Sequence, residues 1–437
     1  MLAEEAIHEA ALEPGPSIFT LASSTRLRIL AYLGVLIVLL GFGAPNGGLI
    51  DVPISFFLKN RLHLPAHEVA LFRLLAATPL YLAFAFGFAR DTFNPLGMGD
   101  RGFFVLFGGA TAAIYAGFAF APIAYPWLLA AVLLSTCAYL FAWSAQNGLA
   151  SAIGQQHVMS GRISAAWNVF QSLPILTAFL LGGALSQMLE GVNAERAART
   201  LFLVGAAVMA ALAVFGLWRP VSVYDNVHRA RAASASRLAD IRRLARHWPI
   251  YPALTVWLLW CFAPGASTPL QFFLQNTLGA NDAQWGDWNA VFVASFIPTF
   301  MLFGWLCRRY ALRGILLWST LVAVPQMVPL AFIHTVIGSY GAAMFMGLTG
   351  GVCSAAFLDL VIRSSPPGLQ GTVMMLYWAL YYIAQRFGDV LGSALYDHYR
   401  NFNACVIAIT VVYALILPVL LLVPRRLTST TDGEAIS

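Results

Sequence analysis

Twelve long apolar stretches occupy most of this 437-residue chain. A helix that crosses a bilayer needs about 20 mostly apolar residues, so each stretch is a candidate membrane span. The predicted spans are Ile29–Leu58, Val69–Phe88, Phe103–Ala121, Trp127–Ala150, Ile163–Leu185, Leu201–Trp218, Ile250–Leu274, Trp288–Cys307, Gly314–Ile333, Gly338–Ile362, Gly371–Tyr396 and Phe402–Val423. The sequence therefore predicts an all-α polytopic membrane protein with twelve transmembrane helices.

The composition excludes several other classes of protein. Hydrophobic residues make up 59% of the chain and charged residues only 10%, whereas soluble proteins carry about 25% charged residues. A soluble enzyme, a disordered chain and a nucleic-acid binder are thereby excluded. The five cysteines lie within or at the end of apolar stretches and form no CxxC pair, so we expect neither disulfides nor a metal site. No nucleotide loop, metal-binding helix or nucleophile elbow occurs, and we predict neither a cofactor nor an enzymatic activity.

The basic residues predict an orientation. If the N-terminus is cytoplasmic, 18 of the 25 basic residues fall in cytoplasmic segments and five in outside loops. The positive-inside rule then predicts that both termini are cytoplasmic. The net charge of +6 reflects these loops and no nucleic-acid partner. The first 25 residues lack an apolar core, so we expect the first span to act as an uncleaved signal anchor.

The two halves of the chain contain a repeat. Residues Pro53–Leu62 and Pro269–Leu278 match at six of ten positions, at an offset of 216. An Ala-Pro pair precedes each segment, at Ala44-Pro45 and at Ala263-Pro264. A unit of six spans, duplicated, gives two halves of the same topology, related by an axis along the membrane normal.

This duplication predicts the domain organisation. We expect a cytoplasmic tail over 1–28, a six-helix bundle over 29–218, a basic linker over 219–249, a second bundle over 250–423 and a cytoplasmic tail over 424–437. The linker carries seven arginines, and residues 230–247 could form an amphipathic helix on the membrane surface. The linker either only connects the two bundles or also has a regulatory or lipid-binding role, and we favour the first.

Two six-helix halves and short motifs resemble the major facilitator superfamily. Phe56-Phe57-Leu58 and Phe272-Phe273-Leu274, each followed by a polar turn, are similar to the folate–biopterin transporter branch and its muropeptide-permease relatives. Gly87 and Asp91 match the first part of the superfamily motif between spans two and three, whereas residues 92–101 replace its basic cluster. The copy after span eight keeps Gly304 but lacks the acidic residue. The chain also resembles the bacteriochlorophyll-delivery and light-harvesting-assembly branch of the superfamily.

The resemblance implies a secondary transporter that works by alternating access. We expect it to move a small, anionic organic solute, with protons as a candidate coupling ion, as a monomer in the lipids of a bacterial inner membrane. The alternative is a pigment or lipid carrier, or a membrane-complex assembly factor, on the same fold.

Charged residues within the first two spans are candidates for substrate binding or coupling. A charge at the bilayer centre costs about 2.5–3.5 kcal/mol and persists beside a partner or a watery cavity. We expect Asp51 and Asn46 to line a central cavity, with Asp51 as a proton carrier, because the Gly- and Pro-rich segment around them should break span one. The alternative is that Asp51 is solvated at the outer interface. Arg73 either pairs with Asp51 or reaches water.

Span eleven carries the best single candidate, Arg386. Its guanidinium can hold two oxygens of a carboxylate or phosphate. Asp389, three residues on, would neutralise Arg386 while no substrate is bound, or the two form an ion pair that only pins the helix. Tyr382 lies one turn earlier. Asn168 and Gln171 in span five either line the cavity or join helices.

Four residues near the cytoplasmic ends of the spans are predicted to form a gate. They are Asp91, Arg308, Asp359 and Arg363. Asp359 and Arg363 lie four residues apart, on one helix face, and should pair. Most aromatic residues are assigned to lipid-facing belts, and no tryptophan is given a role.

Overall fold

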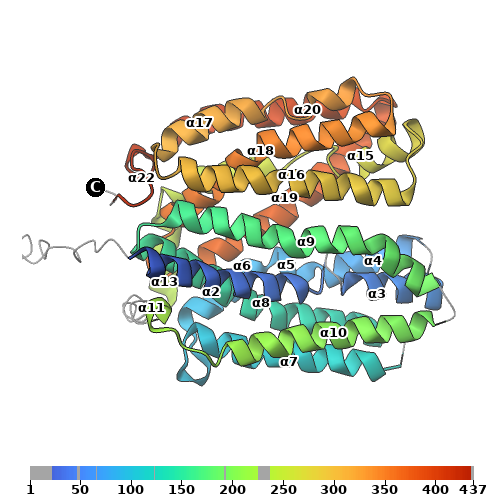
Figure 1. Ribbon diagram of the computed structural model, residues 1–437, viewed down its shortest axis with the longest axis horizontal. Coiled ribbons are helices and arrows are strands. Elements are labelled where there is room, and N and C mark those ends of the chain that lie inside the picture. Colours follow the sequence, from blue (N-terminus) through green and yellow to red (C-terminus); the bar gives the residue numbers. More distant parts are fainter. Residues whose placement is uncertain are drawn as a thin grey trace, which may run out of the picture.

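A computed structural model describes residues 22–46, 50–64, 66–122, 124–190, 193–224 and 237–434. These residues form helices and connecting turns, with no strand among them. The helices run roughly parallel in two bundles that lie side by side (Figure 1). Backbone polar groups have no water to bind inside a bilayer, so helices that satisfy them internally are the expected solution.

The first bundle is built from the N-terminal half of the chain. Its elements are α2 (Ser23–Phe42), α3 (Asp51–Phe56), the π-helical turn η1 (Phe57–Arg61), α4 (Ala66–Ala76), α5 (Thr78–Tyr81), α6 (Ala83–Thr92), the 3-10 turn η2 (Pro95–Gly97), α7 (Asp100–Phe120), α8 (Tyr125–Gln156), α9 (Ser160–Glu190) and α10 (Ala194–Phe215).

The second bundle follows two short helices, α11 (Val221–Tyr224) and α13 (Arg237–Arg246). Its elements are α14 (Ile250–Cys261), α15 (Thr268–Phe272), the π-helical turn η4 (Phe273–Thr277), α16 (Asp282–Leu306), α17 (Leu312–Ala323), the 3-10 turn η5 (Val328–Ala331), α18 (Val336–Ser364), α19 (Gln370–Tyr399), α20 (Asn403–Ala414) and α21 (Ile416–Leu422). Helix α22 (Arg425–Thr428) comes after the bundle.

The broken first and seventh spans display the repeat in three dimensions. Helix α2 ends at Phe42 and α14 at Cys261, just before the two Ala-Pro pairs. Each span resumes as a short helix that passes into a π-helical turn. The two turns begin at Phe57 and Phe273, which preserves the offset of 216 found in the sequence. The predicted break in span one is thus confirmed, and span seven has the same design.

Among the described residues, nine helical segments are long and apolar enough to cross a membrane. The predicted spans two, seven and eleven are not among the nine. Span two is divided into α4, α5 and α6, and span seven into α14 and α15. Span eleven is one long helix, α19, that carries several polar residues. All three spans contribute side chains to the cavity described below.

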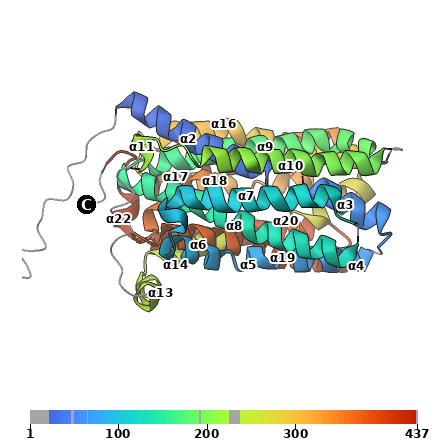
Figure 2. The ribbon, with the colours of Figure 1, turned by 90° about the horizontal axis from the view of Figure 1, so that it is seen from below.

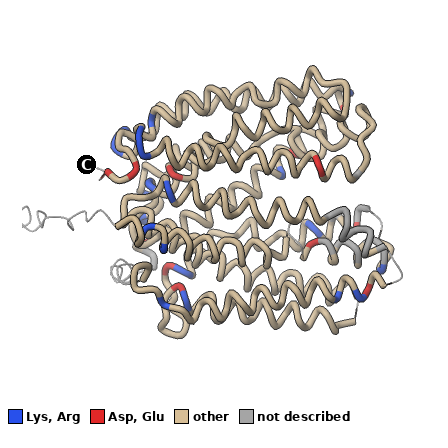
Figure 3. The backbone as a smooth tube through the Cα atoms, viewed as in Figure 1, with Lys and Arg blue, Asp and Glu red and all other residues tan. Residues whose placement is uncertain are grey.

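Most of the charged residues lie toward the two ends of the bundles (Figure 3). The first described residues of α2 and the end of the described chain lie at one end, here named the terminal end (Figure 1). Helix α13 also lies there and runs across the direction of the bundle helices, so that it is seen end-on in Figure 2. It forms the second part of the surface helix expected over 230–247; residues 225–236 lie outside the described residues.

Glycine permits the closest approach between the bundles at the terminal end. A Cβ at Gly87 in α6 would lie 2.4 Å from the carbonyl oxygen of Gly371 in α19. Any side chain at position 87 would therefore push the two helices apart. Close packing of α6 against α19 therefore explains why the motif residue at position 87 is glycine.

Candidate functional site

A cavity of about 600 Å³ lies between the two bundles. That volume is typical of pockets for small organic molecules. Seven residues predicted for substrate binding or coupling line it: Asn46, Asp51, Arg73, Asn168, Gln171, Tyr382 and Arg386. They come from α3, α4, α9, α19 and the break in span one, which are distant in sequence. The tertiary structure therefore brings most of the predicted site together.

Asp51 and Arg73 form an ion pair at the wall of this cavity. The Nη1 atom of Arg73 lies 3.2 Å from Oδ2 and 3.4 Å from Oδ1 of Asp51. The side chain of Arg73 is 42% exposed and that of Asp51 is 25% exposed. The sequence left open whether Arg73 pairs with Asp51 or reaches water, and in the structure it pairs with Asp51.

Arg386 lies on the second bundle and faces the same cavity. Its side chain is exposed, and it makes no ion pair within the described ranges. The expected ion pair with Asp389 is wrong. Asp389 instead accepts hydrogen bonds from the backbone nitrogen and the hydroxyl of Thr268, both at 2.8 Å. It caps the start of α15 and does not line the cavity, because the break in span seven leaves that helix start in need of an acceptor.

Amide side chains add hydrogen-bonding capacity to the cavity wall. The side-chain nitrogen of Asn46 donates to the hydroxyl of Thr136 at 3.1 Å. The side-chain nitrogen of Asn168 donates to the carbonyl of Ser164, one turn earlier, at 2.8 Å. The Oδ1 atom of each asparagine can still accept hydrogen bonds from a ligand.

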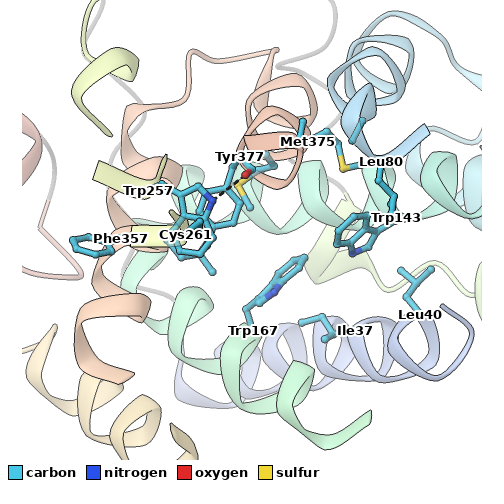
Figure 4. Close-up of a cluster of buried hydrophobic side chains, with 14 of the residues drawn as sticks. Ile37, Leu40, Leu80, Trp143, Trp167, Trp257, Cys261, Phe357, Met375 and Tyr377 are labelled. Atoms are coloured by element: carbon cyan, nitrogen blue, oxygen red, sulfur yellow. Dashed lines mark hydrogen bonds between the residues drawn. The ribbon is translucent and has the colours of Figure 1, made fainter. Parts of the chain in front are cut away.

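Aromatic side chains form the floor of the cavity. Trp143 of α8 and Trp378 of α19 pack with ring centroids 4.9 Å apart. Trp257 stacks on Tyr377 at 4.0 Å, and its indole nitrogen donates to the Tyr377 carbonyl (Figure 4). Trp378 donates to the buried Oδ1 of Asn147 at 2.8 Å, which joins the two bundles.

The sequence interpretation missed this floor, because it assigned tryptophans to lipid-facing belts. The only available signal was the close spacing of aromatic residues from position 377 to 382, beside Arg386. A smaller pocket of about 240 Å³ continues behind the floor toward the break in span seven.

Asp91, one of the predicted gate residues, joins the two bundles at the terminal end. Its carboxylate accepts from the backbone nitrogens of Gly371 and Thr372, at 3.1 and 2.7 Å, and from the Thr372 hydroxyl at 2.7 Å. These groups lie in the first turn of α19, where unpaired N–H groups and the helix dipole favour an anion. Asp91 on the first bundle thereby holds α19 of the second.

Arg90 supports this contact. Its guanidinium binds both carboxylate oxygens of Asp100 at 2.6 Å and Asp91 at 2.8 Å. Only 4% of its side chain is exposed. Helix α6 continues past Arg90 to Thr92, and the arginine is buried against α8. A Cβ at Gly148 of α8 would lie 2.5 Å from its guanidinium carbon.

The other predicted gate residues divide into two groups. Asp359 and Arg363 form the expected pair, with 2.9 Å between Oδ1 and Nε, and both are buried. Arg308 is exposed and forms no ion pair with any described residue. The structure does not bring Arg308 to the gate.

The pattern of contacts defines the conformational state. Described side chains that hydrogen-bond from one bundle to the other lie between the middle and the terminal end. Gln155, for example, donates to the carbonyls of Ile362 and Ser365 at 2.7 and 2.6 Å. The cavity is therefore closed toward the terminal end, while Arg73 and Arg386 remain exposed at its other side. Two repeated bundles around such a cavity define the class of secondary carriers.

Comparison with known proteins gives the family. The sequence model of the Major Facilitator Superfamily matches residues 157–388. The folate-biopterin transporter of Synechocystis sp. (strain ATCC 27184 / PCC 6803 / Kazusa) is 23% identical over 365 residues, which cover 80% of this chain and 71% of that protein. The chain belongs to the Major Facilitator Superfamily. It is an integral membrane protein and a secondary transporter of small-molecule solutes, not an enzyme.

Solved structures agree with this fold. The proton:xylose symporter XylE has a TM-score of 0.71 at 11% identity, covering 94% of this chain and 98% of that one. The transporter FucP in the outward conformation has a TM-score of 0.67 at 13% identity, covering 92% and 99%. The human organic anion transporter MFSD10 has a TM-score of 0.61 at 18% identity, covering 91% and 100%.

Proposed function

We propose that this protein transports a small organic anion, which binds in the cavity between the bundles. One observation carries the proposal: the described cavity wall contains two arginines, Arg73 and Arg386, against a single carboxylate, Asp51. The cavity is therefore cationic when empty. An anionic solute that binds Arg386 would neutralise it.

The rest of the lining suits an organic solute rather than an inorganic ion. Eleven aromatic side chains line the cavity, and their faces provide a large apolar contact surface. The amides of Asn46, Asn168 and Gln171 provide a few directed hydrogen bonds. Apolar walls with a few polar groups are typical of sites for small organic molecules.

The names of two similar proteins support the same class of solute. One is the Synechocystis folate-biopterin transporter and the other the human organic anion transporter MFSD10.

We further propose that Asp51 couples transport to protons. It is the carboxylate of the described cavity wall, whereas Asp389 is held by Thr268 at the start of α15. An anion that draws Arg73 away would remove this cation from Asp51, and a proton bound to the carboxylate would replace its charge. The anion and the proton would then move together. Replacing Asp51 by Asn should abolish the pH dependence of uptake, and unchanged pH dependence would contradict the coupling.

The orientation stays a prediction from the arginine distribution. We propose that the terminal end is cytoplasmic in a bacterial inner membrane, with both termini inside, and that the protein works as a monomer. The open cavity would then face outward. Impermeant labelling of cysteines introduced at the two ends of the bundles, in intact cells, tests this orientation.

Thermal stability of the purified protein against a ligand panel tests the solute class. The panel holds folates and pterins, muropeptide fragments, organic anions, and pigment and lipid extracts. A ligand at 100 times its dissociation constant should stabilise the native state by about 2.7 kcal/mol. Arg386→Ala should lose that shift, and the matched control Arg308→Ala, outside the cavity, should keep it.

Two results would contradict the proposal. One is a shift with an anion that survives Arg386→Ala. The other is no shift with any soluble compound, together with pigment or lipid that copurifies, which would favour the carrier or assembly-factor alternative.

A further inference from the structure

The segment 425–434, after the last span, packs against the terminal end of both bundles. It comprises α22 and a turn that follows it. The sequence interpretation treated this segment only as a cytoplasmic tail. Its side chain at position 432 is fully buried, at 0% exposed. Acidic side chains are almost never fully buried unless partners bind them.

On the first bundle, Asp432 binds the start of α9. One carboxylate oxygen accepts from the backbone nitrogen of Gly161 at 2.9 Å, and the other from Nε of Arg162 at 2.5 Å. The free N–H groups of a helix start and a guanidinium are both suited to a carboxylate.

On the second bundle, the same segment binds three elements. Arg363 of α18 donates to the carbonyl and the hydroxyl of Thr430, at 3.1 and 3.2 Å. The backbone nitrogen of Asp432 donates to the carbonyl of Cys307, at the end of α16, at 2.8 Å. The backbone nitrogen of Leu312, at the start of α17, donates to Thr430 at 3.4 Å. The segment therefore bridges the bundles, with Asp432 as the residue that touches both.

The bundles also meet closely beneath this segment. A Cβ at Gly161 would lie 2.9 Å from Cβ and Sγ of Cys307 and 3.2 Å from Oδ2 of Asp359. That Oδ2 atom is buried without a hydrogen-bond partner among the described residues. A buried carboxylate oxygen without a donor destabilises the closed state, because it has lost its water. Another contact must offset this cost. The bridging segment lies next to Asp359, because Arg363 binds both Asp359 and Thr430.

We propose that residues 425–434 form a clasp that holds the bundles together at the terminal end, and that Asp432 must leave Gly161 and Arg162 before the cavity can open there. The segment thereby sets the balance between the two orientations of the cavity. This inference rests on alternating access but on no particular solute. Whatever modifies or binds the segment would then regulate transport.

The test uses native Cys307, which is 1% exposed beneath the clasp. In the first reporter, the other four cysteines are replaced by alanine: Cys137, Cys261, Cys353 and Cys405. In the second reporter, Cys307 is replaced as well and Ala44→Cys supplies a thiol in the cavity wall. The protein is placed in nanodiscs, which leave both faces accessible, and a polar maleimide measures each labelling rate.

Asp432→Ala, which removes both acceptor oxygens, should raise the labelling rate of Cys307 about 10-fold and lower that of Ala44→Cys. A factor of 10 corresponds to about 1.4 kcal/mol. The matched control is Glu434→Ala, two residues away. Glu434 is exposed and accepts only from Thr431 within its own turn, so both rates should stay unchanged.

The two reporters separate opening from simple undocking. Reciprocal change supports the clasp. A faster Cys307 with an unchanged Ala44→Cys means that the segment leaves without any opening, and this overturns the proposal, as does no change in either rate. Arg162→Met removes the partner of Asp432 on the first bundle and is the second variant if Asp432→Ala does not fold. Neither readout needs a solute, so failure of the clasp and failure of the proposed anion transport are distinguishable.

Discussion

Replacing Arg90 by methionine should destabilise the protein severely, although α6 would keep a long apolar side chain there. The guanidinium makes three charge-assisted hydrogen bonds of 2.6 to 2.8 Å, two to Asp100 and one to Asp91. All three side chains are at most 4% exposed. Removing the arginine takes this cation away from two buried carboxylates, and breaking one side of a buried pair costs about 3–5 kcal/mol.

Denaturant titration of the purified protein in mixed micelles, followed by circular dichroism, measures this cost. The double variant Arg90→Met/Asp100→Asn should be less destabilised than the sum of the single variants by about 2 kcal/mol, since neighbouring members of one network are not additive. Gly148→Ala should act on the same network, because its Cβ would lie 2.5 Å from the guanidinium carbon.

The control for this prediction is Arg308→Met, which changes an exposed arginine and should stay within about 0.5 kcal/mol of the parent. A cost below about 1 kcal/mol for Arg90→Met, the level of an exposed ion pair, would refute the reasoning. Strict additivity of Arg90→Met and Asp100→Asn would refute it equally.

Three further predictions concern other contacts. Asp389→Ala should cost about 1–2 kcal/mol by removing the cap of α15, and a double-mutant cycle with Thr268→Val should show coupling if the two residues act together. Gly87→Ala should separate α6 from α19 and increase cysteine accessibility at the terminal end; unchanged accessibility would contradict the close approach. Burial and, next, nearby Asp359 raise the pKa of Asp432 above its ordinary value of 3.8. The docked carboxyl then binds a proton more tightly than the released one, so docking should strengthen as the pH falls from that raised pKa toward 3.8. Labelling of Cys307, divided by its rate in Asp432→Ala at the same pH, should therefore fall on acidification, and a rise would contradict the sign.

The sequence by itself determined the membrane class, the repeat and the break within span one. Long apolar stretches leave few alternatives in a bilayer, and Gly and Pro disrupt helices through their own backbone geometry, without help from neighbours. The pairing of Asp359 with Arg363 was predictable for the same reason, since four residues along one helix place two side chains on one face.

Contacts between distant segments were decided only by the tertiary structure. The spacing of Arg386 and Asp389 suggested a pair, yet Asp389 binds Thr268, 121 positions earlier in the chain. Nothing local to Trp378 indicates that it meets Asn147 of the other bundle. Asp432 looked like a residue of a solvated tail, and only the packed ends of α9 and α16 supply its partners. A helix period tells which residues share a face, whereas the partner that the face meets depends on how all the helices pack together.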